Sequence, residues 1–334
     1  MKLSLVVPCY NEEAALPETT RRLQELLEDL IRRGKVDDDS SIWLVDDGSR
    51  DQTWPFIHSL STRSARFFGV KLARNHGHQF ALLAGLLSAD GDAVISLDAD
   101  LQDDLGVIEQ MVDEYEKGHE IVYGVRNKRV TDTWFKRWTA ERYYGLLGML
   151  GVGIVPNHAD YRLMGRAALN ALEEYREVNL FLRGIVPQLG FRSTRVYYER
   201  HERIAGETKY PLKKMVALAA DGITSFSAVP LRLIAALGAG VFIMSVGLAI
   251  WILAVRLFTD RAVPGWASTT LPIYALGGIQ LLSLGVVGEY VAKVYMETKR
   301  RPRFLIEKIT SAREVRAGVS PPARASAVQG TASS

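Results

Sequence analysis

The stretch AVISLDADLQD, residues 93–103, decides the fold because it joins a short apolar run to a dense acidic cluster. Its first five residues are typical of a buried parallel strand, which is apolar along its length and ends in polar or turn residues. Three earlier segments show the same pattern: Leu3–Pro8, Ile42–Asp46 and Phe67–Leu72. Between them, leucines recur at helical spacing in residues 18–33 and 79–89. This alternation predicts a mainly parallel α/β sheet, whose ligands bind at the carboxyl ends of the strands.

Three oxygen donors follow the predicted strand at 93–97. Asp98 and Asp100 are separated by one residue, and Gln102 comes two residues later. Carboxylate and amide oxygens suit a hard divalent cation, which can neutralise the charge on a departing diphosphate. Short acidic clusters also form turns and helix caps, and Asp103 or Asp104 can instead cap a helix over residues 105–117. From these residues alone, both interpretations stay open.

Two other predicted strands end in residues suited to ligand binding. VDDGS at 45–49 closes one strand, and VPCYNE at 7–12 closes another with an aromatic ring and an amide that suit a planar base. The Asp-Gly pair at 47–48 equally suits a tight turn, and Asp51 equally suits a helix cap. Three such strand ends at one edge of a sheet are far less expected by chance than one. The sequence therefore predicts a single ligand-binding crevice.

Charge and cysteine content limit the classes of function. Lys and Arg number 41 against 38 acidic residues, and the net charge of +3 gives no case for nucleic-acid binding. Cys9 is the single cysteine and lies in an apolar run, so it is interpreted as a buried thiol on the reducing, cytosolic side of the membrane. Asn11 and the two glutamates after it interrupt the N-terminal apolar run too early for a signal-peptide core. We expect the N-terminal half to stay in the cytoplasm.

Two long apolar segments lie in the second half of the chain. Residues 233–255 and 269–288 carry no charged side chain, and each is near the length that crosses the hydrocarbon of a bilayer. The basic excess before the first and after the second places both flanks in the cytoplasm and the connecting loop outside. Two buried core helices are the alternative interpretation. We expect a multi-pass protein of the inner membrane, with the N-terminal domain and both termini in the cytoplasm.

The chain thus divides into four parts. Residues 1–210 form the α/β domain. Residues 211–230 form an amphipathic helix in the membrane interface, although an ordinary packing helix has almost equal weight. Residues 231–296 form a two-helix transmembrane hairpin. Residues 297–334 form a basic segment and a tail rich in Ala, Ser, Pro and Gly, which we expect to be disordered.

Taken together, these motifs resemble glycosyltransferase family 2, and within it the polyisoprenyl-phosphate glycosyltransferases. The matching segments are Val7–Glu12, Val45–Ser49, Arg74–Asn75 with Gly77, Asp98–Gln102, Asp160–Met164 and Gly206–Pro211. The likeness covers nearly everything except the tail. It implies a nucleotide-binding domain of the GT-A type, a divalent cation (Mg²⁺ or Mn²⁺) and inversion at the anomeric carbon of the transferred sugar.

The resemblance carries roles over to individual positions. It implies that four residues hold the nucleoside of the donor: Pro8, Tyr10, Glu12 and Asp47. Asp98 and Arg126 would contact the donor phosphates, while Asp98, Asp100 and Gln102 would hold the metal. Asp160 matches the position of a base or sugar-orienting acid. Taken without the resemblance, Arg126 is equally well a surface charge, and Asp160 is better explained as a strand-end cap.

The chain also departs from the family pattern. His76 stands where the family often has an aromatic residue. Together with His78 it has the spacing of metal ligands, but no third ligand accompanies the pair. Both are therefore interpreted as surface or packing histidines.

The expected reaction is transfer of a sugar, glucose from a uridine donor, to polyprenyl phosphate at the cytoplasmic membrane face. A phosphate monoester has a second pKa of about 6, so near neutral pH it is an anionic nucleophile that needs no base. Arg200, Arg203 and Lys209 precede the interfacial helix, where they would hold that phosphate or attract anionic lipid headgroups.

Two rival functions are weighed against this one. A processive polysaccharide synthase normally adds a Gln-x-x-Arg-Trp motif, where this chain has only WFKRW at 134–138. A membrane-bound nucleotide sensor would not need Asp98 and Asp100. Association of copies into a homo-oligomer is left open.

Overall fold

The computed structural model describes residues 1–126, 158–177, 180–199 and 266–312, together with scattered positions between 231 and 251. These residues belong to two units. The first takes in the described residues up to 199 and those from 302 onward, and the second takes in those of 231–301. The predicted amphipathic helix at 211–230 and the residues after 312 lie outside the described part of the chain.

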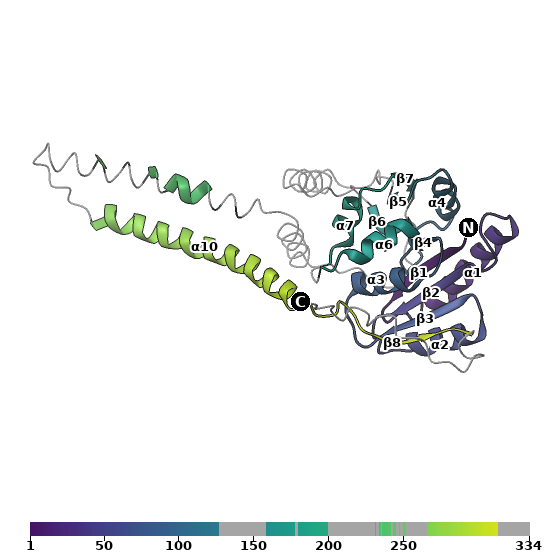
Figure 1. Cartoon of the computed structure of the whole chain (residues 1–334). Coiled ribbons are helices and arrows are strands. Elements are labelled where there is room, and N and C mark those ends of the chain that lie inside the picture. The colour runs from purple at the N-terminus through teal and green to yellow at the C-terminus, as the bar shows by residue number, and fades with distance from the viewer. Residues whose placement is uncertain are drawn as a thin grey trace, which may run out of the picture. The chain divides into compact units, whose positions relative to one another are not determined.

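In the first unit, the described residues form one eight-stranded sheet in the order β7-β5-β6-β4-β1-β2-β3-β8 (Figure 1). The strands are β1 (Leu3–Cys9), β2 (Ser41–Asp46), β3 (Phe67–Leu72), β4 (Ala93–Ser96), β5 (Ile121–Arg126), β6 (His158–Gly165), β7 (Ser193–Tyr198) and β8 (Ile306–Thr310). The first four confirm the strands predicted from apolar runs, each to within two residues at either end. They pair in parallel, so the prediction of a mainly parallel α/β sheet is confirmed.

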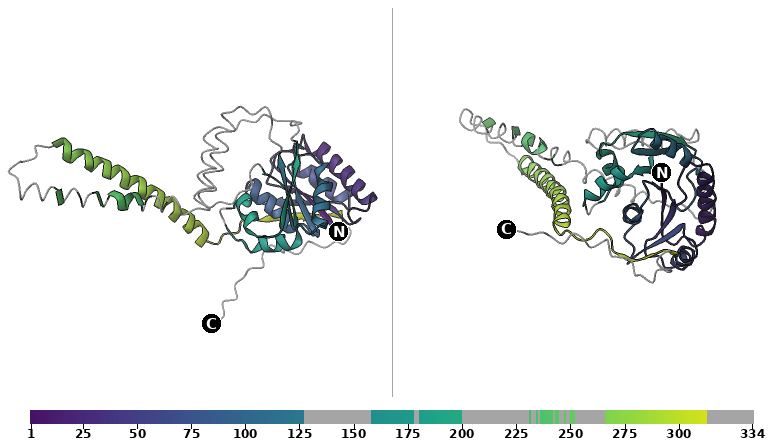
Figure 2. Two further views of the ribbon diagram at one scale, coloured as in Figure 1. Left: turned by 90° about the horizontal axis from the view of Figure 1, so that it is seen from above. Right: turned by 45° about the vertical axis from the view of Figure 1, so that its right-hand side comes forward.

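Helices cover both faces of this sheet, and Figure 2 shows the sheet between the two layers. The described residues of the first unit form the helices α1 (Leu16–Arg32), α2 (Thr53–Arg63), α3 (His78–Ser88), α4 (Val107–Glu116), α6 (Arg166–Glu174) and α7 (Leu182–Gln188). Leucines at helical spacing give α1 one apolar face, and this face packs in the main hydrophobic core. Residues of α2 and α4 belong to the same core. The other face carries α3, α6 and α7. The structure is therefore a three-layer arrangement with the sheet in the middle.

Helix α3 lies unusually close to the sheet. A Cβ added at Gly85 would come within 2.4 Å of Val6 Cγ1 and 2.8 Å of Val45 Cγ2. Only a residue without a side chain permits this approach. The close contact holds α3 against β1 and β2.

Strand β6 runs against its neighbours. It pairs antiparallel with β4 on one side and with β5 on the other, so its first residues lie at the edge where β4 and β5 end. Strand β7 is parallel to β5 and ends at the same edge. The reversal brings the start of β6 to the predicted ligand edge.

Strand β8 comes from the far end of the chain. It pairs antiparallel with β3 at the edge of the sheet, and Thr310 Oγ1 lies 2.7 Å from Ser61 Oγ. The boundary predicted at residue 210 leaves this strand out of the first domain and assigns it to the basic segment. The reason is that its partners lie more than 200 residues earlier in the chain, beyond the reach of any local pattern.

The described part of the second unit contains the long helix α10 (Trp266–Thr298), which includes the segment predicted as the second span. Large apolar side chains are exposed along it, among them Ile273, Leu281, Leu284 and Val291. Within the described residues, no helix meets the length and apolarity needed to cross a membrane. The two-span hairpin therefore stays a prediction.

Candidate active site

The carboxyl ends of the parallel strands meet the start of β6 at one edge of the sheet. Ser96 in β4 pairs with Arg162 in β6, and extending this antiparallel register by two residues sets Asp98 opposite Asp160. A histidine confirms the juxtaposition, because His78 Nε2 lies 3.6 Å from Asp98 Oδ1 and 3.5 Å from Asp160 Oδ2. The structure thus brings the predicted metal ligand and the predicted catalytic acid together.

Three basic side chains surround the Asp160 carboxylate. Arg162 donates from Nη2 to Oδ1 at 2.7 Å. Arg183 donates from Nε to Oδ1 at 3.3 Å and from Nη2 to Oδ2 at 3.1 Å. Burial alone would raise the pKa of Asp160, but the hydrogen bond with His78 and the charges of the two arginines outweigh it and hold the pKa well below its usual range. Asp160 is therefore ionised.

Separate elements hold this cluster in place. Asp160 and Arg162 are two residues apart on β6, so their side chains share one face of the sheet. His78 begins α3, and Arg183 is the second residue of α7. These two helices are joined because the Leu182 amide donates to Gln79 Oε1 at 2.9 Å. The neighbours of His78 and Arg183 in the chain thus fix both residues beside Asp160.

The loop after β4 carries the predicted metal ligands. Its tightest point is Leu101, whose φ of 53° lies in the left-handed region that bulky residues rarely adopt. The turn lets Asp100 Oδ1 accept from the Gln102 amide at 3.3 Å. Gln102 is only 6% exposed, so the two aspartates are the more accessible of the three predicted ligands.

Asp98 is the electrostatic focus of this loop. Burial raises its pKa to about 6, and neighbouring carboxylates, with Asp103 foremost, add to the effect against the opposing influence of His78. A carboxylate in these surroundings is stabilised by an added positive charge.

The donor set fits a hard divalent cation in its chemistry. Asp98 and Asp100 supply carboxylate oxygens, and Gln102 carries an amide oxygen. Within the described ranges, no three His, Cys, Asp or Glu side chains are grouped so that they alone could hold a metal ion.

Asp103 ties the loop to the ends of two strands. Its Oδ1 accepts from Arg126 Nη2 at 3.2 Å and forms a short hydrogen bond with the Tyr198 hydroxyl. Arg126 Nε also donates to that hydroxyl at 3.1 Å. Asp103 therefore does not cap α4, whose N-cap residue is Gly106. Arg126 lies at the predicted site, but two of its three side-chain nitrogens already donate to Asp103 and Tyr198. We call these three residues the brace of the loop.

The ends of β1 and β2 form the other side of the crevice. Pro8 is buried within β1, whereas Tyr10 just beyond the strand is 43% exposed. The Glu12 amide donates to Thr53 Oγ1 at 2.8 Å, which fixes the loop after β1 against the start of α2. Asn11 stands between them with a φ of 54°. The loop after β1 thus leaves the Tyr10 ring exposed, and the nucleoside-binding role of these residues stays a prediction.

Asp47 organises the loop that leads into α3. Its two carboxylate oxygens accept from the amides of His76 at 2.7 Å and Gly77 at 2.9 Å. Gly48 follows with a φ of 67°, and a Cβ there would stand 2.6 Å from backbone atoms of Arg74 and Asn75. The sequence Asp-Gly is thus a turn, as the structural interpretation held, and it positions the loop that carries the two histidines.

Two buried side-chain atoms at this end have no hydrogen-bond partner among the residues that the structure describes. They are Asp46 Oδ2 and His76 Nε2. Burial raises the pKa of Asp46 above its ordinary value. Unpaired buried polar atoms are uncommon in native proteins, and many are found at functional sites.

Sequence reasoning missed three members of the site. His78 was interpreted as a surface or packing histidine, yet its half-exposed ring contacts both aspartates. Arg162 lay within a matching segment without a role of its own, although its spacing of two residues from Asp160 on a strand was a usable signal. No local pattern marked Arg183. Of the predicted acceptor-binding residues, Arg200, Arg203 and Lys209 lie outside the described part of the chain.

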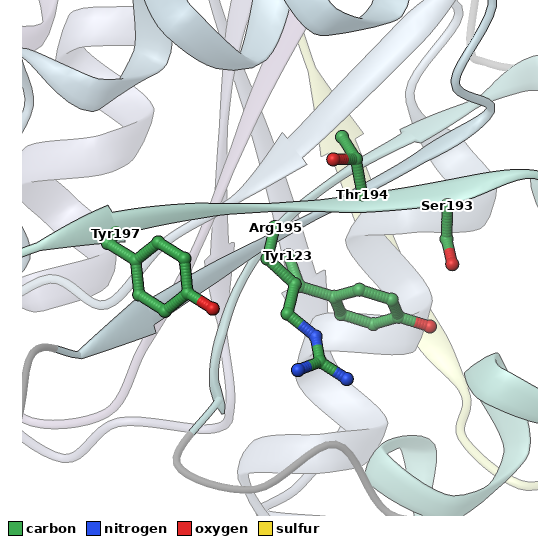
Figure 3. A pocket seen from close by; sticks show the side chains of 5 residues that line it. All are labelled: Tyr123, Ser193, Thr194, Arg195 and Tyr197. Atoms are coloured by element: carbon green, nitrogen blue, oxygen red, sulfur yellow. The ribbon is translucent and has the colours of Figure 1, made fainter.

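A separate shallow pocket lies on the outer strands β5 and β7. Figure 3 shows its lining residues, with the side chains of Tyr123, Arg195 and Tyr197 on the same side of β7. It shares no residue with the predicted site, and no carboxylate lines it. The candidate active site is therefore the edge where the strands end.

Comparison with known proteins places the chain among glycosyltransferases. The family model described as glycosyl transferase family 2 matches residues 4–173. The uncharacterized glycosyltransferase YkoT of Bacillus subtilis strain 168 is 50% identical over 307 residues, which cover 91% of this chain and 91% of that protein. The bactoprenol glucosyl transferase of Shigella phage SfII is 38% identical over 312 residues, with 92% of this chain and 98% of that protein covered.

Solved structures resemble the chain more distantly. Glucosyl-3-phosphoglycerate synthase from Mycobacterium tuberculosis, crystallised with Mn²⁺, uridine diphosphate and phosphoglyceric acid, is 21% identical. The match has a TM-score of 0.45 and covers 67% of this chain and 76% of that structure.

Proposed function

Because the chain belongs to glycosyl transferase family 2, we propose that it transfers a sugar from a nucleotide-diphosphate donor to polyprenyl phosphate. Relatives that are named bactoprenol glucosyl transferases match it over nearly the whole chain, which supports glucose and a polyprenyl acceptor. A uridine donor is part of the proposal. In the reaction, an oxygen of the acceptor phosphate attacks the anomeric carbon, the bond from that carbon to the diphosphate breaks, and the nucleoside diphosphate leaves with inversion.

The observation that carries the proposal is the placement of Asp98 beside Asp160 at the carboxyl edge of the sheet. His78 contacts both carboxylates, so the loop after β4, which we propose binds the donor, faces Asp160. A sugar held between them would have its anomeric carbon close to both.

Asp98 and Asp100 would hold the divalent cation, Mg²⁺ or Mn²⁺, with Gln102 as the third predicted ligand. When bound, the cation supplies Lewis-acid stabilisation of the charge on the leaving diphosphate. The chain's own contribution is to fix the loop, since Asp103, Arg126 and Tyr198 hold it against β5 and β7.

Asp160 orients the reactants in this proposal and does not remove a proton. Its low pKa keeps it ionised but makes it a weak base. The acceptor phosphate is already largely a dianion near neutral pH, because its second pKa is about 6. The proposed step therefore needs no general base.

The nucleoside would occupy the crevice formed by the ends of β1 and β2. The exposed Tyr10 ring suits stacking on a planar base. Pro8 and Glu12 flank Tyr10 in and after β1. Asp47 contributes indirectly in this proposal, because it holds the loop before α3 through the amides of His76 and Gly77.

We further propose that the protein works at the cytoplasmic face of the inner membrane. The support is the apolar composition of 233–255 and 269–288, the exposed apolar side chains of α10 and the basic flanks of both segments. In this proposal Arg200, Arg203 and Lys209 meet the acceptor phosphate at the membrane surface. A tag inserted near Pro264 should react with a reagent outside intact cells while one at the C-terminus should not, and the opposite pattern would overturn the topology.

The experiment that tests the reaction is incubation of the purified chain and polyprenyl phosphate with a panel of labelled nucleotide sugars. We expect label in the lipid fraction with UDP-glucose and little with the other donors. Transfer from a different donor would correct the sugar, whereas no transfer from any donor would contradict the proposed function.

A further inference from the structure

Arg183 presents an unused edge beside the proposed reacting groups. Its Nε and Nη2 face the Asp160 carboxylate. Its Nη1 makes no hydrogen bond or ion pair with any residue that the structure describes. The side chain keeps 42% of its surface exposed. One side of the guanidinium is thus anchored, and the other side is open to a ligand.

The charge balance distinguishes Arg183 from its neighbour Arg162. Arg162 has an exposed fraction of 0% and forms its ion pair with Asp160 at 2.7 Å. It cannot reach a ligand, and it already neutralises the single charge of that carboxylate. Arg183 is therefore a second positive charge beside Asp160, and it also lies near the Asp98 carboxylate. Of the two arginines, only Arg183 is exposed.

The surroundings fix Arg183 before any ligand arrives. Asp160 lies on β6, and the hydrogen bond from the Leu182 amide to Gln79 Oε1 holds the start of α7 against α3. An arginine held in this way loses little side-chain entropy when it binds an anion. The planar fork of a guanidinium matches the oxygens of a phosphate.

We propose that Arg183 binds a phosphate group of a substrate, and that Asp160 is the positioning residue that aims its guanidinium. This inference rests on the proposed function, because that function supplies the phosphates. Two substrates carry the required group: the polyprenyl phosphate acceptor and the diphosphate of the donor.

The test is equilibrium binding to the full chain in detergent, with three probes: short-chain polyprenyl phosphate, the corresponding polyprenol, and UDP. Arg183→Gln should weaken binding of one phosphate ligand about 10- to 100-fold, since it removes a charge-assisted hydrogen bond. Polyprenol binding should not change. Loss for polyprenyl phosphate assigns Arg183 to the acceptor, and loss for UDP assigns it to the donor diphosphate.

Arg66 offers a matched control. It is ion-paired to Asp38, with Nη2 at 2.8 Å from Oδ1, and its side chain is 26% exposed. It precedes β3, and therefore lies at the amino ends of the parallel strands, away from the carboxyl ends where the candidate site lies. Arg66→Gln should bind all three probes as the wild type does. If Arg183→Gln does not fold, Arg183→Lys carries the test, because lysine keeps the charge but loses the fork and should weaken binding about 10-fold.

The positioning role of Asp160 has its own readout. Asp160→Asn should weaken phosphate binding when Arg183 is present and add little when Arg183 is already glutamine, because it acts through that residue. Additive losses would indicate only a structural role for Asp160.

Unchanged binding of both phosphate ligands by Arg183→Gln, or no binding of either by the wild type, would overturn the inference. The binding assay needs no turnover, so its result is separable from the proposed function. A chain that binds through Arg183 but transfers no sugar would contradict only the proposed function.

Discussion

Asp160 is expected to stabilise the fold as well as serve the reaction, and Asp160→Asn separates these two contributions. Its partner Arg162 is fully buried, and no hydrogen bond reaches the Arg162 Nε atom. Among the described residues, Arg162 makes one other hydrogen bond, a weak one to the Leu182 carbonyl at 3.5 Å. Replacing the carboxylate with an amide leaves this buried guanidinium without its ion-pair partner.

The size of the effect follows from that burial. Removing one partner of a buried ion pair costs about 3 to 5 kcal/mol, because the other charge is left uncompensated in a low-dielectric interior. Asparagine keeps one oxygen acceptor, so we expect the lower end, about 3 kcal/mol. For a domain of this size that corresponds to a fall in Tm of about 6 to 12 °C.

Thermal unfolding of the full chain in detergent, followed by near-UV circular dichroism, measures the change. The control is Asp38→Asn, which breaks the exposed pair with Arg66 and should cost less than about 1 kcal/mol. Adding Arg162→Met to Asp160→Asn should recover most of the lost Tm, since an apolar side chain removes the unpaired charge. An unchanged Tm for Asp160→Asn, or no recovery in the double variant, would refute the reasoning.

Three further predictions concern the loops of the site. Asp100→Ala should abolish transfer with the fold intact, and undiminished turnover in metal-free buffer would contradict the metal assignment. Asp103→Asn should weaken UDP binding about 10-fold, because it releases the loop from Arg126 and Tyr198. Tyr198→Phe should have a smaller effect. Calorimetry measures both, and equal UDP affinities of the wild type and the two variants would exclude a role for these contacts. Gly48→Ala should lower stability to denaturant by about 2 kcal/mol, because a left-handed φ and a contact of 2.6 Å with backbone atoms both oppose a side chain, and an unaltered denaturation midpoint would count against it.

The sequence predicts the central strands well because β1, β2 and β4 are mostly apolar and are buried at every position. The acidic residues after those runs are predictable as site residues for a related reason, since parallel strands end at a common edge. Asp98 and Asp160 illustrate both the reach and the limit of this reasoning. Each was singled out by motif, but their contact depends on the antiparallel course of β6.

Residues whose role depends on tertiary contacts could not be found in the same way. Arg183 belongs to a segment with no recognisable motif, and only the packing of α7 against α3 and β6 brings it to Asp160. Strand β8 carries two adjacent charged residues, Glu307 and Lys308, and Thr310 contacts residues 241 and 249 positions earlier. Local periodicity carries no information about such pairings.

The most direct test of the proposed reaction is incubation of the purified chain with UDP-glucose and polyprenyl phosphate. A mass spectrum of the lipid and the amount of UDP released are then measured together. The proposed reaction predicts a polyprenyl phosphate carrying a single hexosyl group, with one UDP released for each lipid modified. Release of UDP with the lipid unchanged, or a lipid carrying a growing sugar chain, would contradict it.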